Sequence, residues 1–415
     1  MYLRRLGLTN FRCYRQLDLT LPSGIVVVAG GNAQGKSSLL EAAYVLATTR
    51  STHARTDREL VHWDADDEVI PYSRVWGEVA QAGEALTIEV LNVGASAEPG
   101  EDRFTKRVRV NNVPRRAFDV IGLLKVVLFT PRDLEVVDGA PAERRRYLDV
   151  LLCQIDRSYC QALSRYNQVL TQRNHLLRRL RERGGDRAEL RFWDERLVAD
   201  GALLLGRRLE TVAALNALAA PLHADLVGGG DPFAMRYVPS VTDRSQPARQ
   251  LAQADEAGDG RAAPARETIA ASFADTLAAR REEELARGMT VIGPHRDDLV
   301  FTVGGVDMRV FGSRGQQRTA TLALKLAEAR LMWTESGDRP VLLLDDVLSE
   351  LDAHRRSYLL GHIDAHQQTL ITTTEAEALP AEFLEEALVL EVAGAAITAA
   401  RRNGRAVRPP VSGVQ

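Results

Sequence analysis

The chain contains the stretch Gly30-Gly31-Asn32-Ala33-Gln34-Gly35-Lys36-Ser37, a complete phosphate loop of the pattern G-x-x-x-x-G-K-S. The apolar run 25–29 before it predicts a buried strand, and residues 39–47 after it predict a helix. A strand, a glycine-rich loop and a helix in this order bind phosphate, because backbone N–H groups and the helix N-terminus attract phosphate oxygens. A chance glycine turn before a helix is the weaker alternative. We therefore predict a bound nucleoside triphosphate.

Two carboxylates supply the second half of the predicted nucleotide site. Lys36 would reach the β- and γ-phosphates, and Ser37 would place its hydroxyl on Mg²⁺. Asp345 ends an apolar strand predicted at 340–346, where it can accept the same Mg²⁺. Asp346, one residue beyond, can polarise an attacking water as a general base. A purely structural role is the alternative for both residues, and it is the stronger alternative for Asp346.

The composition limits the class of protein and its compartment. The chain has 415 residues, 45% of them hydrophobic, and a formal net charge of −3. This length predicts about two domains, and the near-neutral charge means that any surface for nucleic acid must be local. Three cysteines without metal-ligand spacing are typical of reduced thiols. With no signal peptide and no stretch of about 18 apolar residues, we predict a soluble, cytoplasmic protein without a membrane segment.

Motif order and hydrophobic periodicity predict a nucleotide-binding domain in two halves with a helical domain between them. Residues 1–140 would hold the phosphate loop and an antiparallel β subdomain. Residues 288–415 would hold the metal-binding strand and the other half of the domain. Residues 141–287 are predicted to form an arm of two long antiparallel helices. A low-complexity run suggests a flexible excursion near 226–266.

Three basic segments are candidate contacts for DNA or another acidic partner. They are the loop 48–60, a hairpin at 103–116 and the helices at 141–183, which carry ten arginines against four carboxylates. A solvated surface explains each segment about as well. The basic residues of the hairpin are Arg103, Lys106, Arg107, Arg109, Arg115 and Arg116.

A second phosphate-binding surface is predicted at Ser313, Gly315 and Gln316, which precede a helix expected at 318–334. Two such surfaces in one chain suggest that the second serves a nucleotide bound by another copy. Asp352 belongs to the run 349–352, which has the spacing of a loop that would contact the same loop of a second copy across the interface. We therefore predict a dimer that encloses two nucleotides at its interface.

Taken in order, these motifs resemble those of ABC-type ATPases of the SMC/Rad50 head branch. Within that branch the chain closely resembles the RecF family of bacterial recombination mediators, over nearly its whole length. The run 293–298 is the most family-specific of the motifs and the phosphate loop the least. The motifs that carry the resemblance lie at residues 8–12, 31–38, 144–146, 292–299, 313–318 and 343–352.

The resemblance implies an α/β fold, in which an ABC-type P-loop ATPase domain has a mixed sheet, an antiparallel β subdomain and an inserted α-helical arm. It implies ATP and Mg²⁺ as cofactors, slow ATP hydrolysis and a homodimer that forms when ATP is bound. It also implies binding to single-stranded and double-stranded DNA at gaps or junctions, in association with the nucleoid. The implied protein partners are RecR and RecO, with which the family helps to load RecA at single-stranded gaps.

The resemblance also assigns roles to individual residues. Asp345 would be the metal-side carboxylate and Asp346 the hydrolytic one. Asp346 stands where transporter-type relatives have glutamate, and its shorter side chain fits slow turnover. Residues 372–374 are threonines where many ABC ATPases have a histidine that senses the γ-phosphate, so no such sensor is assigned. Nucleotide contacts are assigned to Gly30, Gly31, Asn32, Ala33, Gln34, Gly35, Lys36, Ser37 and Ser38, and across the dimer to Ser313, Gly315, Gln316 and Asp352.

The leading hypothesis is an ATP-gated DNA clamp, and another head of the same ABC branch is its nearest alternative. A transporter ATPase subunit is less favoured, because the sequence Ser313-Arg314-Gly315-Gln316 departs from the Leu-Ser-Gly-Gly-Gln signature. A monomeric P-loop kinase is the third possibility. It would need no second phosphate surface, so phosphotransfer by ATP-independent monomers would favour it.

Overall fold

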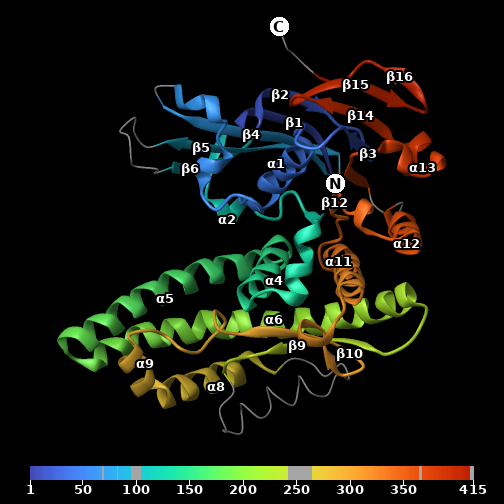
Figure 1. Cartoon of the computed structure of the whole chain (residues 1–415). Coiled ribbons are helices and arrows are strands. Elements are labelled where there is room, and N and C mark those ends of the chain that lie inside the picture. The colour runs from blue at the N-terminus through green and yellow to red at the C-terminus, as the bar shows by residue number, and fades with distance from the viewer. Residues whose placement is uncertain (68–69, 82, 95–103, 242–263, 364–366, 412–415) are drawn as a thin grey trace. The chain divides into compact units, whose positions relative to one another are not determined.

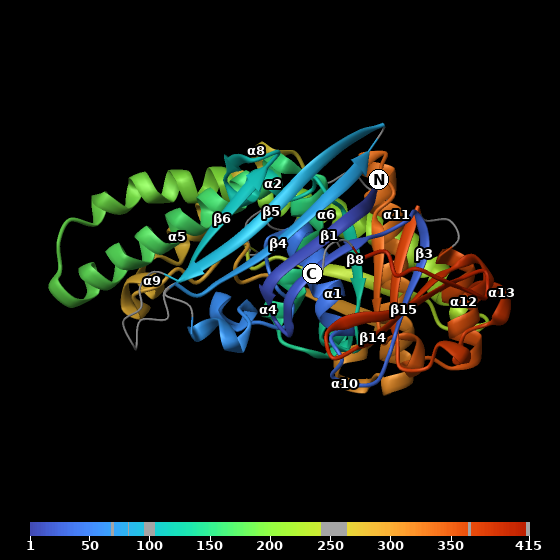
Figure 2. The ribbon, with the colours of Figure 1, turned by 90° about the horizontal axis from the view of Figure 1, so that it is seen from above.

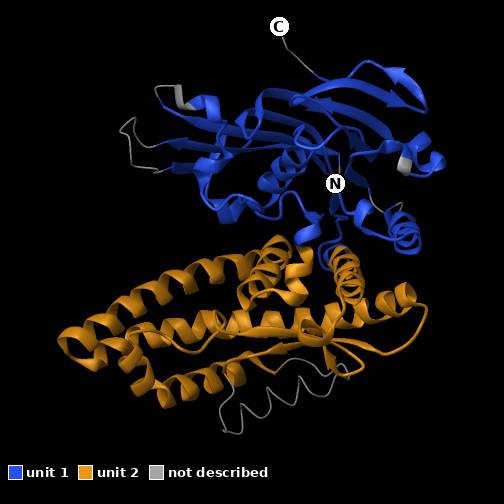
Figure 3. Ribbon diagram, viewed as in Figure 1, with its two compact units in different colours: residues 1–132, 332–415 blue, residues 133–331 orange. Residues whose placement is uncertain are grey.

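The chain forms two compact units, which Figure 3 shows in different colours. Unit 1 combines residues 1–132 with residues 332–415, and unit 2 consists of residues 133–331. The computed structural model describes residues 1–67, 70–81, 83–94, 104–241, 264–363 and 367–411.

Residues 288–331 pack within unit 2, whereas the sequence analysis grouped them with the ATPase domain. Strand β10 (Asp298–Val303) pairs antiparallel with β9 (Phe233–Val238). Asp298 also accepts two hydrogen bonds, of 2.6 and 3.0 Å, from the guanidinium of Arg144 on helix α4 (Pro141–Ile155). These long-range contacts explain the difference, because periodicity along the sequence does not reveal which strands pair.

The described residues of unit 1 form two sheets. The first is antiparallel with the order β2-β1-β4-β5-β6-β7, and Figure 2 shows β1, β4, β5 and β6 side by side. The second has the order β16-β15-β14-β3-β13-β12-β8, and its strands from β14 to β8 are parallel. The strands are β1 (Tyr2–Phe11), β2 (Tyr14–Thr20), β3 (Gly24–Ala29), β4 (Tyr72–Gln81), β5 (Glu84–Gly94), β6 (Phe104–Val110), β7 (Val113–Arg115), β8 (Val126–Phe129), β12 (Val341–Asp345), β13 (Gln368–Thr373), β14 (Leu388–Ala393), β15 (Ala396–Arg402) and β16 (Arg405–Val407).

Helix α1 (Lys36–Thr48) contacts both sheets of unit 1 (Figure 1): β1, β4 and β5 of the first, and β8, β12 and β13 of the second. Small and aliphatic side chains cover most of its surface, which explains why eleven of its thirteen residues are buried. The packing against β4 is close at Gly77, where a Cβ atom would lie 2.6 Å from Cδ1 of Leu46. The helix that follows the phosphate loop is therefore held between two sheets.

Unit 2 is built around two long helices, α5 (Arg157–Arg183) and α6 (Leu190–Val227), which lie side by side in Figure 1. Ion pairs join Arg165 to Asp200 and Arg179 to Glu189, and their order shows that the two helices run antiparallel, as the sequence predicted. The other helices in the described part of this unit are α3 (Glu135–Asp138), α4, α8 (Arg266–Ala279), α9 (Arg281–Arg287), α10 (Met308–Phe311) and α11 (Arg314–Ser336), whose last residues belong to unit 1. A small sheet with the order β11-β10-β9 includes β11 (Val306–Asp307).

Some arginines of the helical segment lie inside unit 2. Arg144 and Arg173 are 1% and 0% exposed, and so is Arg208 of α6 at 1%. Arg173 bonds Asp194 at 2.8 Å and also donates to the carboxylate of Glu284. A buried guanidinium needs such partners, because an unpaired buried charge is costly. The interpretation of residues 141–183 as a basic surface is therefore wrong for Arg144 and Arg173.

The run 293–298 forms much of the polar core of unit 2. The carbonyl oxygen of Pro294 accepts a hydrogen bond of 2.6 Å from Arg208. His295 Nδ1 lies 2.8 Å from the Tyr166 hydroxyl, and burial lowers the pKa of His295 to about 4. Burial also raises the pKa of Asp297, although hydrogen bonds from Ser240 and Tyr237 oppose this shift. This run connects helices and strands that are far apart in sequence.

Two strands, β9 and β16, are not predicted from the sequence. Strand β9 lies within residues 226–266, for which the low-complexity run suggests a flexible excursion, and β16 lies among the last described residues. In β9 the buried residues Phe233, Met235 and Tyr237 alternate with exposed ones, a period-2 signal that the neighbouring low-complexity run obscured. The rest of the predicted excursion, at 242–263, lies outside the described residues, and so does Arg103.

Candidate nucleotide-binding site

The phosphate loop connects β3 to α1 at the carboxyl edge of the parallel strands. Gly35 has a φ of 107°, and a Cβ atom there would lie 2.8 Å from the hydroxyl oxygen of Tyr14. Glycine is needed for both reasons, since the backbone is left-handed and the space is taken. The Tyr14 hydroxyl also donates to the carbonyl oxygen of Gly35 over 3.2 Å. Strand β2 therefore supports the loop from one side.

A second support comes from the turn between β14 and β15. The backbone N–H of Gly394 donates to Oε1 of Gln34 over 2.6 Å, and the N–H of Ala395 donates to its carbonyl oxygen over 3.1 Å. The side chain of Gln34 in turn donates to the carbonyl oxygen of Asn32 over 3.3 Å. Gln34, which the sequence analysis took as a nucleotide contact, thus also anchors the loop to the sheet.

Lys36 lies within the phosphate loop. Its Nζ atom donates to the carbonyl oxygens of Gly30 and Gly31 over 2.8 and 2.7 Å. The side chain is 8% exposed, and burial lowers its pKa, while the charges of Asp346 and Asp345 act in the opposite direction. An ammonium group held among loop carbonyls and carboxylates is suited to bind phosphate oxygens.

Asp345 and Ser37 meet at the same edge of the sheet. The Ser37 hydroxyl donates to Asp345 Oδ1 over 2.8 Å, and the Thr372 hydroxyl donates to the same oxygen over 2.7 Å. No described residue donates to Oδ2 of Asp345. A carboxylate oxygen beside a serine hydroxyl is a hard-oxygen arrangement that suits Mg²⁺, so these residues fit the predicted metal.

Asp346 directly follows β12 in a left-handed conformation, with a φ of 53°. Its backbone N–H donates to Thr372 Oγ1 over 2.9 Å, and its carbonyl oxygen accepts from the Ser349 hydroxyl over 2.8 Å. Within the described part of the chain, no hydrogen-bond donor contacts its carboxylate. The backbone of Asp346 is therefore fixed, while its carboxylate is available for a ligand or water.

Asp352 serves as the N-cap of helix α12 (Ala353–Ile363). Its Oδ1 atom accepts from the backbone N–H of Arg355 over 2.9 Å, and this bond lowers the pKa of the carboxyl group. The Arg355 guanidinium pairs with its other oxygen. Capping alone accounts for an aspartate at this position, whatever further contact it makes.

Ser313, Gly315 and Gln316 lie in unit 2, at the start of α11. Ser313 Oγ accepts from the backbone N–H of Gln316 over 3.3 Å, and Oε1 of Gln316 accepts from the N–H of Ser313 over 2.9 Å. This reciprocal pair is a capping box. Apart from its chain neighbours and the backbone of its own helix, no atom of the described residues lies within 4 Å of a Cβ built at Gly315. Contacts with these residues therefore do not require the glycine, and backbone could approach it from outside.

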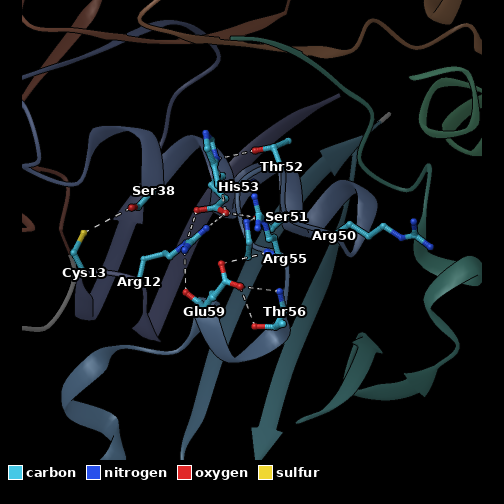
Figure 4. A network of polar contacts seen from close by, with 12 residues as sticks. Arg12, Cys13, Ser38, Arg50, Ser51, Thr52, His53, Arg55, Thr56 and Glu59 are labelled. Carbon is cyan, nitrogen blue, oxygen red and sulfur yellow. Dashed lines mark hydrogen bonds and ion pairs between the residues drawn. The ribbon is translucent and has the colours of Figure 1, made fainter. Parts of the chain in front are cut away.

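A network of polar contacts extends from α1 to the loop after it (Figure 4). Glu41, which is 4% exposed, accepts hydrogen bonds from Arg12 over 2.8 and 2.6 Å and a further one from the Ser51 hydroxyl. Ser51 Oγ accepts from the backbone N–H groups of His53 and Ala54 over 2.9 and 2.7 Å. The base of the predicted basic loop 48–60 is thus fixed to the phosphate-loop helix.

The basic hairpin is only partly free for a partner. Lys106 pairs with Asp57 at 2.8 Å, and Arg109 pairs with Glu89 at 3.4 Å. Arg107 and the arginines at 115–116 are exposed.

Among the residues that the structure describes, no helix is long and apolar enough to cross a membrane, and no group of three His, Cys, Asp or Glu side chains is placed to hold a metal.

Comparisons with known proteins match the whole arrangement. A family model described as the RecF/RecN/SMC N terminal domain matches residues 2–389. The DNA replication and repair protein RecF of Chloroflexus aurantiacus is 47% identical over 394 residues, which cover 92% of this chain and 96% of the relative. This chain belongs to the RecF family. Its RecF relative from Geobacillus kaustophilus is 38% identical, over 96% of this chain and 100% of that protein.

Solved RecF structures agree with the fold. A structure described as the recombination mediator protein RecF-ATP in the RecFOR pathway has a TM-score of 0.81 and 29% identity, and it covers 95% of this chain and 96% of that one. A second structure, of RecF-ATPrS, has the same TM-score and identity and covers 97% of that chain. The predicted α/β head fold with a mixed sheet, an antiparallel sheet and long helices is thereby confirmed. Membership of the RecF family also disfavours the transporter and kinase alternatives.

Several residues of this site were not predicted for the roles they have. Thr372 bonds the Asp345 carboxylate and the Asp346 backbone N–H. Tyr14 supports Gly35, and Glu41 joins helix α1 to the following loop. The partners of Thr372 depend on the pairing of β13 with β12, which the sequence does not specify. The partners of Tyr14 and Glu41 depend on turns whose geometry the sequence does not specify.

Proposed function

We propose that this RecF-family chain binds ATP with Mg²⁺ at the phosphate loop and hydrolyses it slowly. The main support is the geometry at Asp345. Its Oδ1 atom accepts hydrogen bonds from both Ser37, over 2.8 Å, and Thr372, which leaves Oδ2 for a cation. Mg²⁺ would neutralise phosphate charge there. Lys36 would hold the phosphate oxygens, and Asp346 would accept a proton from the attacking water. The RecF structure described with ATP supports the choice of nucleotide.

ATP binding is tested by titrating the protein with a fluorescent ATP analogue, with and without Mg²⁺. Lys36→Arg keeps the charge but not the compact ammonium that fits between the loop carbonyls. We expect this variant to lose affinity by at least about tenfold, since charge-assisted contacts to phosphate contribute about 1.5–3 kcal/mol. Equal affinity of wild type and variant would refute the assignment of the loop.

We further propose that ATP closes a homodimer, in which Ser313 and Gly315 of one copy contact the γ-phosphate held by the other. The capping box supports this role because it orients the first N–H groups of α11, and the open space at Gly315 permits close approach. Gln316 would orient Ser313, and Asp352 would lie in the loop that contacts the same loop of the second copy. Sedimentation with and without ATP tests dimerisation.

The biological role that we propose is that of a recombination mediator acting with RecO and RecR. The relatives are described as DNA replication and repair proteins and as members of the RecFOR pathway. ATP binding would close the dimer on DNA at a gap or junction, hydrolysis would release it, and the three proteins together would help to load RecA. Sedimentation repeated with gapped, single-stranded and duplex DNA tests this proposal. If none of the three changes the ATP-dependent dimer, the DNA-clamp proposal fails.

A further inference from the structure

Thr372 contacts the side chain of Asp345 and the backbone of Asp346. It lies on β13, opposite Asp345 on β12 and Val28 on β3 in the parallel register. Its side chain is buried, with 1% of the residue exposed. The hydroxyl donates to Asp345 Oδ1 over 2.7 Å and accepts from the backbone N–H of Asp346 over 2.9 Å. One hydroxyl therefore contacts both residues.

The two bonds act on different groups, the side chain of Asp345 and the backbone of Asp346. A hydroxyl has one hydrogen and two acceptor lone pairs, so a single threonine can donate to one partner and accept from another. The donated bond orients the side chain of Asp345. The accepted bond holds Asp346 in its left-handed conformation, which costs a residue other than glycine about 1 kcal/mol or more.

We propose that Thr372 is a positioning residue that sets the geometry of the metal-side and hydrolytic carboxylates together. This inference rests on the proposed ATPase function. Ser37 and Thr372 both donate to Oδ1 of Asp345, and this keeps Oδ2 directed away from them for a cation. Loss of the Thr372 hydroxyl frees the Asp345 side chain to rotate and removes a support of the Asp346 backbone.

The same strand supplies a matched control. Thr369 is also 1% exposed, and its hydroxyl is buried without a hydrogen-bond partner among the described residues. Thr→Val replaces a hydroxyl by a methyl group of similar size in both positions. At Thr369 the change removes an unpaired polar group, whereas at Thr372 it removes two hydrogen bonds at the site. A general effect of the substitution on β13 would appear in both variants.

The experiment compares Thr372→Val, Thr372→Ser and Thr369→Val with the wild type. We measure affinity for a fluorescent ATP analogue in EDTA, the Mg²⁺ concentration at the midpoint of the Mg²⁺-dependent gain, and the turnover number. We expect Thr372→Val to raise the Mg²⁺ midpoint by about 10-fold or more, since groups that orient metal ligands contribute about 10–100-fold. Affinity in EDTA should stay within about twofold, because Lys36 and the loop are unchanged.

Thr372→Ser keeps the hydroxyl and should restore the Mg²⁺ midpoint, and Thr369→Val should behave as the wild type. A normal Mg²⁺ midpoint and turnover in Thr372→Val would overturn the inference, and so would an equal loss in Thr369→Val. If Thr372→Val does not fold, Thr372→Ala is measured in its place by the same criteria. A wild type that binds no ATP analogue would instead refute the proposed function itself, so the two failures are distinct.

Discussion

Ser37 donates its hydroxyl to Oδ1 of Asp345 over 2.8 Å, although 308 positions separate the two residues in the sequence. The bond joins the first residues of α1 to the end of β12. It places a neutral hydroxyl beside a carboxylate that is 6% exposed, an environment in which a carboxylate needs a cation or hydrogen bonds. Two hydroxyls stabilise one oxygen of Asp345, and the proposed Mg²⁺ would bind the other.

Asp345→Asn should separate the charge of this residue from its hydrogen bonds. Asparagine Oδ1 can still accept from Ser37 and Thr372, but the side chain is neutral and binds a divalent cation weakly. We expect ATP affinity in EDTA to be unchanged and the gain on adding Mg²⁺ to fall by about 10-fold or more. Calorimetric titration with and without Mg²⁺ measures both quantities, and an undiminished Mg²⁺ gain would contradict the metal assignment.

Asp346→Asn should slow hydrolysis while sparing ATP binding. Removing a general base costs about 10²–10⁴-fold in rate, and the backbone bond of Asp346 to Thr372 is kept. The variant should therefore accumulate as an ATP-bound dimer in sedimentation experiments. Phosphate release at the wild-type rate would show that another group accepts the proton.

Ser313→Arg should block the proposed dimer without affecting ATP binding, because the long side chain would occupy the position of the γ-phosphate. Ser313→Ala is the matched control, since it removes the hydroxyl and its capping bond, at about 1 kcal/mol of stability, without adding a bulky side chain. Sedimentation with ATP distinguishes the two variants. Dimers of Ser313→Arg that form as readily as wild-type dimers would rule out the composite site.

Arg144→Glu should change the stability of the chain, whereas Arg107→Glu should leave stability unchanged and test DNA binding. Arg144 is 1% exposed and pairs with Asp298, so reversing its charge places a buried carboxylate beside a partly buried one and should lower the free energy of unfolding by about 3–5 kcal/mol. Arg107 is exposed, and its reversal should leave stability within about 0.5 kcal/mol. If the hairpin contacts DNA, Arg107→Glu should lower DNA affinity and flatten its salt dependence. Urea unfolding and DNA titrations at several salt concentrations measure these effects.

Stability should fall in mild acid because of His295. Burial lowers its pKa to about 4 in the folded chain, whereas an unfolded histidine has a pKa of about 6.5. Between these values the unfolded state binds more protons, so the stability present above about pH 6.5 is lost toward about pH 4, by about 3 kcal/mol for this group. Asp297, whose pKa is raised, acts in the opposite direction. The difference in pH profile between wild type and His295→Gln isolates the histidine, and parallel profiles would contradict the prediction.

The sequence predicted which segments of the candidate site come together better than it predicted the partners of individual side chains. The phosphate loop and Asp345 each follow an apolar strand, and parallel strands bring their carboxyl ends to one edge, so their proximity follows from topology. Side-chain partners do not follow in this way. The positive charge of Arg144 gives no sign of Asp298, which lies 154 positions away.

The capping box illustrates a different limit. Ser313 and Gln316 have the spacing that a helix start requires, so the same residues fit a structural cap and a phosphate contact. Sequence cannot divide these roles, because both use the same orientation of the first N–H groups of a helix. Thr372 is a similar case, since only the register of β13 against β12 brings its hydroxyl to the carboxylates.

The strand order of unit 1 also governs when the nucleotide site can form during synthesis. Strand β3, which leads into the phosphate loop, pairs with β13 and β14, near the other end of the chain. The backbone N–H of Leu3 likewise donates to the side chain of Gln368 over 2.8 Å, across 365 positions. Unit 2 is one continuous segment, and it leaves the ribosome before β13. Domains fold as units during translation, so the helical unit can fold before β13 and β14 have been synthesised and can pair with β3.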